Sequence, residues 1–264
     1  MKRIVLFFTT LFLLQANLGF GQRERIINLP TEDERKLHFG YYLGLNNNSY
    51  KINYLSETDA NTPLPPTLSE FFIEVNESIG FNLGFIVDLR LHKNINLRFE
   101  PGLMSNSKEL IFYNEEYLKY PAYNGTTNNI RDVSSTFLHL PLLFKFSTDR
   151  LNNIRPYVIG GVSYDYNFSS NEDNKDDNYD GEFRATTHNF MYEVGIGMDF
   201  YFYFFKFSPS IRGVFAINNE LVRDDGQILT TPPPANQPYS IEGPWTGPID
   251  FLGTRGLYLN LTFE

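Results

Sequence analysis

The 264-residue chain contains no cysteine and only four histidines, and its 31 acidic residues outnumber 22 basic ones. Without cysteine it can form neither disulfides nor thiolate sites for zinc or iron-sulfur clusters. Its net charge of -9 argues against nucleic-acid binding, which relies on basic residues that neutralise phosphates. We therefore expect no disulfide framework, no cofactor and no nucleic-acid partner.

Long hydrophobic runs are also lacking. Two basic residues precede an apolar run at 4–14, which falls well short of the roughly 20 residues that a spanning helix needs. Gly19 and Gly21 then form a small-x-small cleavage pattern. We expect residues 1–21 to be a signal peptide, so that the protein is exported, and residues 22–37 to be a flexible tail.

Aromatic residues are abundant, at 16% of the chain, and many of them recur with a period of two. Between Asn189 and Tyr201, apolar side chains alternate with glycine and acidic residues. This alternation indicates a β-strand with one apolar and one polar face. Seven further segments show it, with more or fewer interruptions: 39–54, 79–91, 95–112, 138–146, 154–168, 205–218 and 257–263.

The connections between these strands alternate between long and short. The long ones are 55–77, 113–131, 169–187 and 220–250, and the short ones are 92–94, 147–153 and a turn near Tyr203. In an up-and-down meander, all long loops then lie at one end, as in bacterial outer-membrane barrels. We predict an all-β fold: an eight-stranded antiparallel up-and-down outer-membrane β-barrel over residues 38–264, with the tail 22–37 in the periplasm.

A soluble lipocalin-like barrel would show the same alternation, with its apolar side chains inside. Three features favour the membrane version, in which apolar side chains face lipid. Glycines are frequent on the polar face, aromatic residues gather at strand ends, and Phe263 lies next to the end of the last strand. We therefore expect a multi-pass barrel in the outer membrane, with lipid as one partner.

The polar face of the predicted strands carries six basic and five acidic residues. The interior of an eight-stranded barrel is filled by side chains, and unpaired charges there are costly. We expect these residues to pair into a network that fills the lumen and leaves no site for a small-molecule substrate. Its predicted members are Asp88, Arg90, Arg98, Glu100, Lys145, Arg155, Asp165, Glu193, Asp199, Lys206 and Arg212.

The sequence gives only weak signs of catalysis or metal binding. A histidine and a serine can form a catalytic pair in a lipid-modifying barrel, and the candidates are His139, His188, Ser163 and Ser210. Scattered histidines and serines also lie close together by chance. His139 is better explained as a hydrogen-bonded side chain that fills the lumen. Residues 176–181 resemble the start of a calcium loop that lacks its acidic twelfth position. We predict no catalytic, cofactor or metal residues, and whether this acidic loop binds calcium is left open.

Several stretches resemble one family. They are 78–88 with 94–102, 194–200, 254–256 and, most specifically, Lys206-Phe-Ser-Pro-Ser-Ile-Arg212 with 216–221. Together, over roughly 36–264, they resemble the PorT/SprT proteins of the type IX secretion and gliding-motility machinery. The resemblance implies a non-enzymatic outer-membrane component of protein secretion, with other secretion subunits as partners. The alternatives are a small barrel enzyme that modifies lipid and a structural barrel similar to OmpA.

The segment 220–250 is the candidate partner loop. Its many prolines limit the entropy that is lost on docking. Tyr239 and Trp245 offer the aromatic anchors that interface hot spots favour. We predict that this loop contacts another subunit.

Overall fold

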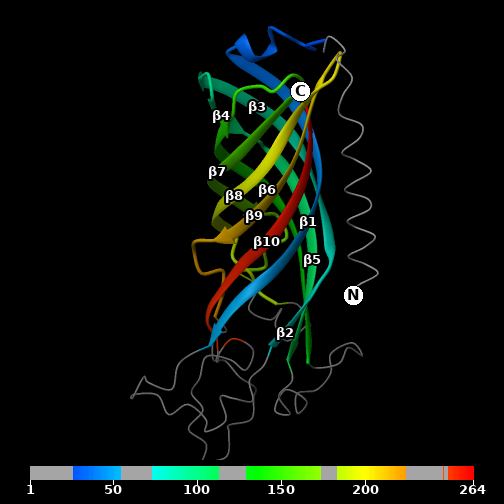
Figure 1. The fold of residues 1–264 in the computed structure, drawn as a ribbon. Helices are drawn as coiled ribbons and strands as arrows, with labels where there is room; N and C mark the ends of the chain where they lie inside the picture. The colour runs from blue at the N-terminus through cyan, green and yellow to red at the C-terminus, as the bar shows by residue number, and fades with distance from the viewer. Residues whose placement is uncertain (1–25, 55–72, 113–128, 174–182, 224–245, 247–248) are drawn as a thin grey trace, which may run out of the picture.

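The computed structural model describes residues 26–54, 73–112, 129–173, 183–223, 246 and 249–264 (Figure 1). A short 3-10 helix, Glu32–Glu34, precedes ten strand segments. These are β1 Leu37–Tyr54, β2 Ile73–Glu77, β3 Ile79–His92, β4 Ile95–Phe99, β5 Gly102–Phe112, β6 Ile130–Ser147, β7 Ile154–Asn167, β8 His188–Tyr201, β9 Lys206–Ala216 and β10 Ile249–Phe263. Among the residues so described, no helix is long and apolar enough to cross a membrane.

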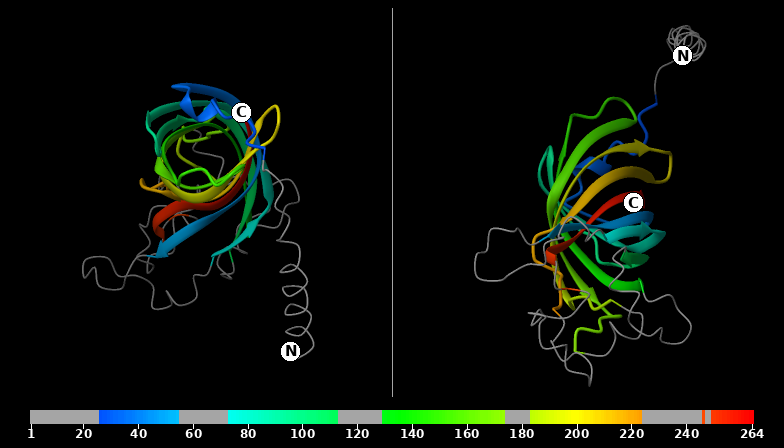
Figure 2. Two further views of the ribbon diagram at one scale, coloured as in Figure 1. Left: turned by 45° about the horizontal axis from the view of Figure 1, so that its top comes forward. Right: turned by 90° about the horizontal axis from the view of Figure 1, so that it is seen from below.

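The segments form one antiparallel sheet that closes into a barrel (Figure 2). Strand β1 closes the ring, because it pairs with β10 on one side and with β3 on the other. β2 continues β3 beyond Ser78, and β4 and β5 are one strand interrupted at Glu100 and Pro101, since β3 and β6 each pair with both segments. The ten segments therefore make a ring of eight strands, which confirms the predicted up-and-down barrel.

The two ends of the ring differ. Residues 26–36, Glu264 and the short β3–β4, β6–β7 and β8–β9 turns lie at one end (Figure 1). The strand ends that lead to the long predicted connections lie at the other. By the layout of outer-membrane barrels, we call these the periplasmic and the extracellular end.

The part of the barrel nearer the periplasmic end, which we call the membrane level, has an apolar outer surface. On β3, Phe81, Leu83 and Phe85 are 54%, 43% and 72% exposed, and on β8 Ile196 is 64% exposed. Residues of opposite parity on the same strands, such as Asn82 on β3 and Glu193 on β8, are buried inside the ring. The apolar faces of the strands therefore point toward lipid, as the sequence predicts.

The part nearer the extracellular end, which we call the extracellular level, has the reverse polarity. Lys51, Asp132 and Arg255 point outward and are exposed. Inside the ring an apolar cluster is buried: Tyr50, Ile73, Leu110, Phe112, Val133, Phe183, Ile249 and Leu252. This level is built like a soluble β-barrel that stands above the membrane.

Three predicted strand boundaries are wrong in the extracellular level. β2 lies within the expected loop 55–77, β6 begins at Ile130 and β10 begins at Ile249. These extensions carry polar residues on their outer face, so they escape a search for strands whose outer face is apolar. Their inner apolar residues supply part of the extracellular cluster.

Two glycines on the inner face make room for large lumen side chains. A Cβ on Gly197 would lie 2.3 Å from the Tyr157 ring, and one on Gly102 would lie 2.2 Å from the Tyr42 hydroxyl. Both distances are far below ordinary carbon contacts. The glycine-rich inner face therefore lets a narrow ring hold aromatic and charged side chains.

Candidate functional site

Arg98 on β4 is the centre of an ion-pair network inside the membrane level. Its side chain is fully buried, and its Nη2 lies 2.8 Å from Asp88 and 2.7 Å from the terminal residue, Glu264. Lys206 approaches the second oxygen of Glu264 at 2.6 Å. A buried guanidinium in this position needs several carboxylate partners, because burial removes its hydration.

A second pair spans the lumen. Arg212 on β9 donates two hydrogen bonds to the Glu100 carboxylate, at 2.6 and 2.9 Å. Three strands separate β9 from the β4–β5 strand in either direction around the ring, so the partners come from opposite walls. The bidentate geometry is the strongest form of such a pair, and it blocks the lumen at this height.

Two more clusters continue the network on β6, β7 and β8. Lys145 approaches both oxygens of Asp199 at 2.7 Å. His139 lies between Asp165 and Glu193, with its two ring nitrogens 2.5 and 3.2 Å from their oxygens. Both nitrogens face carboxylates and each needs a hydrogen to donate, so the geometry favours the imidazolium form.

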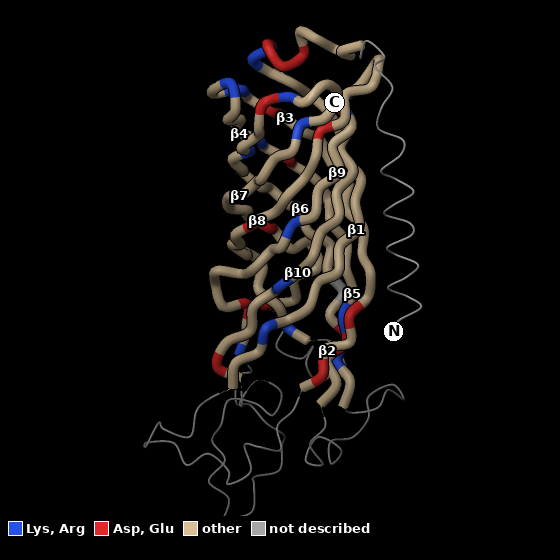
Figure 3. The backbone as a smooth tube through the Cα atoms, in the orientation of Figure 1, with Lys and Arg blue, Asp and Glu red and all other residues tan. Residues whose placement is uncertain are grey.

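With His139 charged, the buried members on the strands and Glu264 make six cations and six anions, and Asp33, the partner of Arg155 in the segment 26–36, adds a seventh anion. The cations are Arg98, His139, Lys145, Arg155, Lys206 and Arg212, and the anions are Asp88, Glu100, Asp165, Glu193, Asp199 and Glu264. Figure 3 shows that charged residues in this part of the ring come from many strands. Near-balance of this kind lets a closed interior hold many charges at a small net charge.

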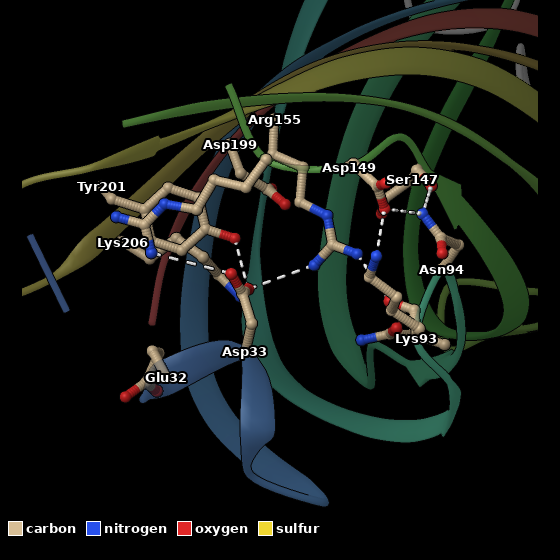
Figure 4. A network of polar contacts seen from close by, with 12 residues as sticks. Glu32, Asp33, Lys93, Asn94, Ser147, Asp149, Arg155, Asp199, Tyr201 and Lys206 are labelled. Carbon is tan, nitrogen blue, oxygen red and sulfur yellow. Dashed lines mark hydrogen bonds and ion pairs between the residues drawn. The ribbon is translucent and has the colours of Figure 1, made fainter. Parts of the chain in front are cut away.

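The segment 26–36 caps the network at the periplasmic end. Asp33 accepts hydrogen bonds from Arg155 at 3.1 Å and from the Tyr201 hydroxyl at 2.6 Å (Figure 4). The Arg150 guanidinium packs 3.7 Å from the centre of the Tyr201 ring and donates to the Asn28 carbonyl. The sequence predicted a flexible tail here, and the structure places this segment against the end of the barrel, where Asp33 gives Arg155 a carboxylate partner.

The predicted lumen residues can now be placed. Ten of the eleven are buried: Asp88, Arg98, Glu100, Lys145, Arg155, Asp165, Glu193, Asp199, Lys206 and Arg212. Arg90 is half-buried at the periplasmic rim, where its backbone N–H bonds to the Lys36 carbonyl. The prediction missed Glu264 and Asp33 as members. Glu264 continues the alternation of Thr262 and Phe263, so the sequence pattern could have identified it as a lumen residue. Asp33 comes close to Arg155 only because residues 26–36 fold against the barrel.

The interior of the extracellular level is mainly apolar, with a few buried polar groups. Lys108 lies 3.9 Å above the centre of the Tyr50 ring. Glu220, just outside the strands, accepts hydrogen bonds from the backbone and hydroxyl of Thr254 at 2.9 and 2.7 Å. A cavity of about 200 Å³ opens beside this cluster, lined among others by Ser135, Asn167, Asn171 and Phe183.

The residues considered for catalysis differ in their exposure. His139, Ser163 and Ser210 are buried, whereas His188 is exposed and contacts the Tyr164 hydroxyl at 2.7 Å. Within the described ranges, no group of three or more acidic or histidine side chains could hold a metal ion. The partner-loop residues Tyr239 and Trp245 and the acidic segment 176–181 lie outside the described residues.

The closed ring, its apolar wall and its charged interior define an outer-membrane type of barrel. Comparison with known families agrees, because residues 7–222 match the outer membrane protein beta-barrel domain, and the chain belongs to this family. It is a protein of the outer membrane. A comparison with curated protein sequences found no match.

Two solved structures of outer-membrane proteins are similar to this chain. OprG from Pseudomonas aeruginosa aligns with 11% identity and a TM-score of 0.39, over 85% of this chain and 93% of its own. AlkL, solved by solid-state NMR in DMPC bilayers, aligns with 12% identity and a TM-score of 0.38, over 93% of this chain and 94% of its own.

Proposed function

We propose that the protein is a non-enzymatic outer-membrane component of the type IX secretion machinery, which acts through its outer surfaces. The observation that carries this proposal is the pair between Arg212 and Glu100, which joins opposite walls of the ring. The cap of residues 26–36 adds a second layer at the periplasmic end. Cargo proteins are far larger than any space in such an interior, so this chain supports their export from outside its lumen.

The assignment to type IX secretion is based on the resemblance of 206–212 and 216–221 to the PorT/SprT proteins. In the structure the first stretch is the beginning of β9, and its Lys206 and Arg212 both belong to the lumen network. The resemblance thus includes residues that close the barrel. A subunit that stabilises or assembles the secretion apparatus fits this arrangement.

Deletion of the gene tests the proposal. Many unrelated secreted proteins should accumulate in the periplasm, and expression of the wild-type chain should restore their export. A deletion strain that exports its cargo normally and changes only in lipid composition would instead support a lipid-modifying enzyme. A strain with a weakened envelope and normal export would support a structural barrel.

The partner surface is proposed on the segment 220–250, with Tyr239 and Trp245 as anchors. Replacement of residues 232–248 by a Gly/Ser segment of equal length should impair export and abolish crosslinks to neighbouring subunits. The heat-modifiable mobility of the folded barrel serves as the control for folding. Undiminished export with an intact barrel would place the partner site on the periplasmic turns or on the outer wall.

A further inference from the structure

The turn between β8 and β9 differs from the other short turns at the periplasmic end. Its four residues are Phe202, Tyr203, Phe204 and Phe205, and Tyr203 and Phe204 are 70% and 85% exposed. The β3–β4 and β6–β7 turns are charged instead, and their Lys93 and Asp149 form an ion pair at 2.9 Å. One side of the periplasmic end is thus aromatic, while the other is polar.

The aromatic turn is continuous with the lipid-facing wall. The Phe205 ring lies 6.2 Å from Phe263, which in turn lies 5.2 Å from Phe207 and 5.3 Å from Tyr41. Figure 2 shows the β8–β9 hairpin leaning outward from the ring rather than across its opening. Its rings therefore extend the apolar wall beyond the end of the barrel.

The cap places more apolar residues beside this turn. The Asn28 side chain donates to the Tyr201 carbonyl at 3.0 Å, and Asn153 donates to the Ile26 carbonyl at 2.9 Å. These bonds hold Ile26 and Ile27, 77% and 55% exposed, next to the base of the hairpin.

We infer that these residues form an apolar corner, consisting of Ile26, Ile27 and 202–205, that is embedded in the periplasmic leaflet of the outer membrane. A contiguous apolar patch of this kind is costly in water and marks an interaction site. Aromatic rings are favoured at the level of lipid headgroups. Lipid is the occupant because the patch continues a wall that lipid already covers. The membrane thereby holds both the hairpin and the start of the cap.

This embedding makes the barrel asymmetric in the membrane. The β8–β9 hairpin reaches into the periplasmic leaflet, whereas the charged β3–β4 and β6–β7 turns stay outside it. The apolar band is thus taller on one side. Ile26 and Ile27, the first described residues of the cap, lie on that side.

Tryptophan fluorescence tests this inference, because the chain has a single tryptophan. In a Trp245→Phe background, Phe204→Trp is refolded into phosphatidylcholine vesicles with and without bromine near the headgroup end of the acyl chains. Leu257→Trp, on the lipid-facing wall, is the control for contact with lipid, and Lys93→Trp is the control for contact with water. Heat-modifiable mobility shows that each variant has folded.

For Phe204→Trp we expect blue-shifted emission and a loss of fluorescence in brominated vesicles comparable to that of Leu257→Trp, with little quenching by acrylamide. Ile26→Trp should behave in the same way, because the start of the cap shares the leaflet. Red-shifted emission that acrylamide quenches and bromine does not, as for Lys93→Trp, would overturn the inference and leave the corner as a site for a periplasmic protein. Tyr203→Trp provides a second probe should Phe204→Trp fail to fold.

Discussion

Strand β1 carries two opposite patterns along its length. In the membrane level, Leu43 and Leu45 point outward while Asn46 is buried inside. In the extracellular level, Lys51 points outward while Tyr50 packs inside with the apolar cluster. The period of two is the same in both, so the surroundings of the strand, lipid or water, decide which face is apolar.

The two levels are consequently stabilised by different forces. In the extracellular level, water drives apolar side chains into a core, as in a soluble protein. In the membrane level, the outer face already lies in hydrocarbon, and the interior consists of paired charges such as Arg212 and Glu100. Removal of a charged side chain should therefore destabilise the barrel most in the membrane level. Shortening of a buried apolar side chain should destabilise it most in the extracellular level.

The largest effect is expected from Arg98→Ala in the membrane level. This change leaves Asp88, Glu100 and Glu264 without their shared cation. Removal of one partner of a buried pair costs about 3 to 5 kcal/mol. Urea unfolding of the refolded barrel in vesicles measures the loss. Arg90→Ala is the matched control and should cost much less, because Arg90 is only half-buried at the rim.

In the extracellular level, Leu110→Ala should destabilise the barrel by about 2 to 5 kcal/mol, since it leaves a cavity in the apolar cluster. The Leu110 side chain is completely buried. The same unfolding assay applies, and Ile111→Ala, at the next and more exposed position, is the control. Equal effects at the two positions would show that this level lacks a true apolar core.

An outward arginine should distinguish the two levels directly. Ile196→Arg places a charge in hydrocarbon and should cost about 2 to 4 kcal/mol near the midplane. Thr136→Arg, at an exposed outward position on β6 in the extracellular level, should be close to neutral. The comparison uses folding yield and unfolding free energy in vesicles. A harmless Ile196→Arg would reverse the assignment of the lipid-facing side.

The smallest effect is a pH dependence confined to the extracellular end. The N–H and hydroxyl of Thr187 donate to Glu172 at 2.9 and 2.8 Å, and these bonds lower the pKa of Glu172 below its ordinary value. The resulting stabilisation is present above the ordinary pKa of about 4.3 and is lost as the pH falls through the lower pKa of the folded state. Protection of the Thr187 amide from hydrogen exchange should fall accordingly. Glu172→Gln should remove this pH dependence.

The sequence predicted the membrane level well because its strands satisfy one rule, an apolar outer face and a polar inner one. That rule placed Glu193, Lys206 and Arg212 in the lumen without any knowledge of their partners. It could not find β2 or the start of β10, where the rule is reversed. It could not place Asp33 either, because that contact joins residues more than a hundred positions apart and depends on the closed barrel.

Planar-bilayer recording tests most directly the central claim that the lumen is closed by its own side chains. The purified barrel is compared with a variant in which residues 22–36, including the cap, are deleted. Both should show no stepwise conductance, because the pair between Arg212 and Glu100 lies beneath the cap and spans the ring. Steady conductance steps in the wild-type chain would contradict a closed lumen. Steps only after the deletion would show that the cap, and not the charge network, closes the barrel.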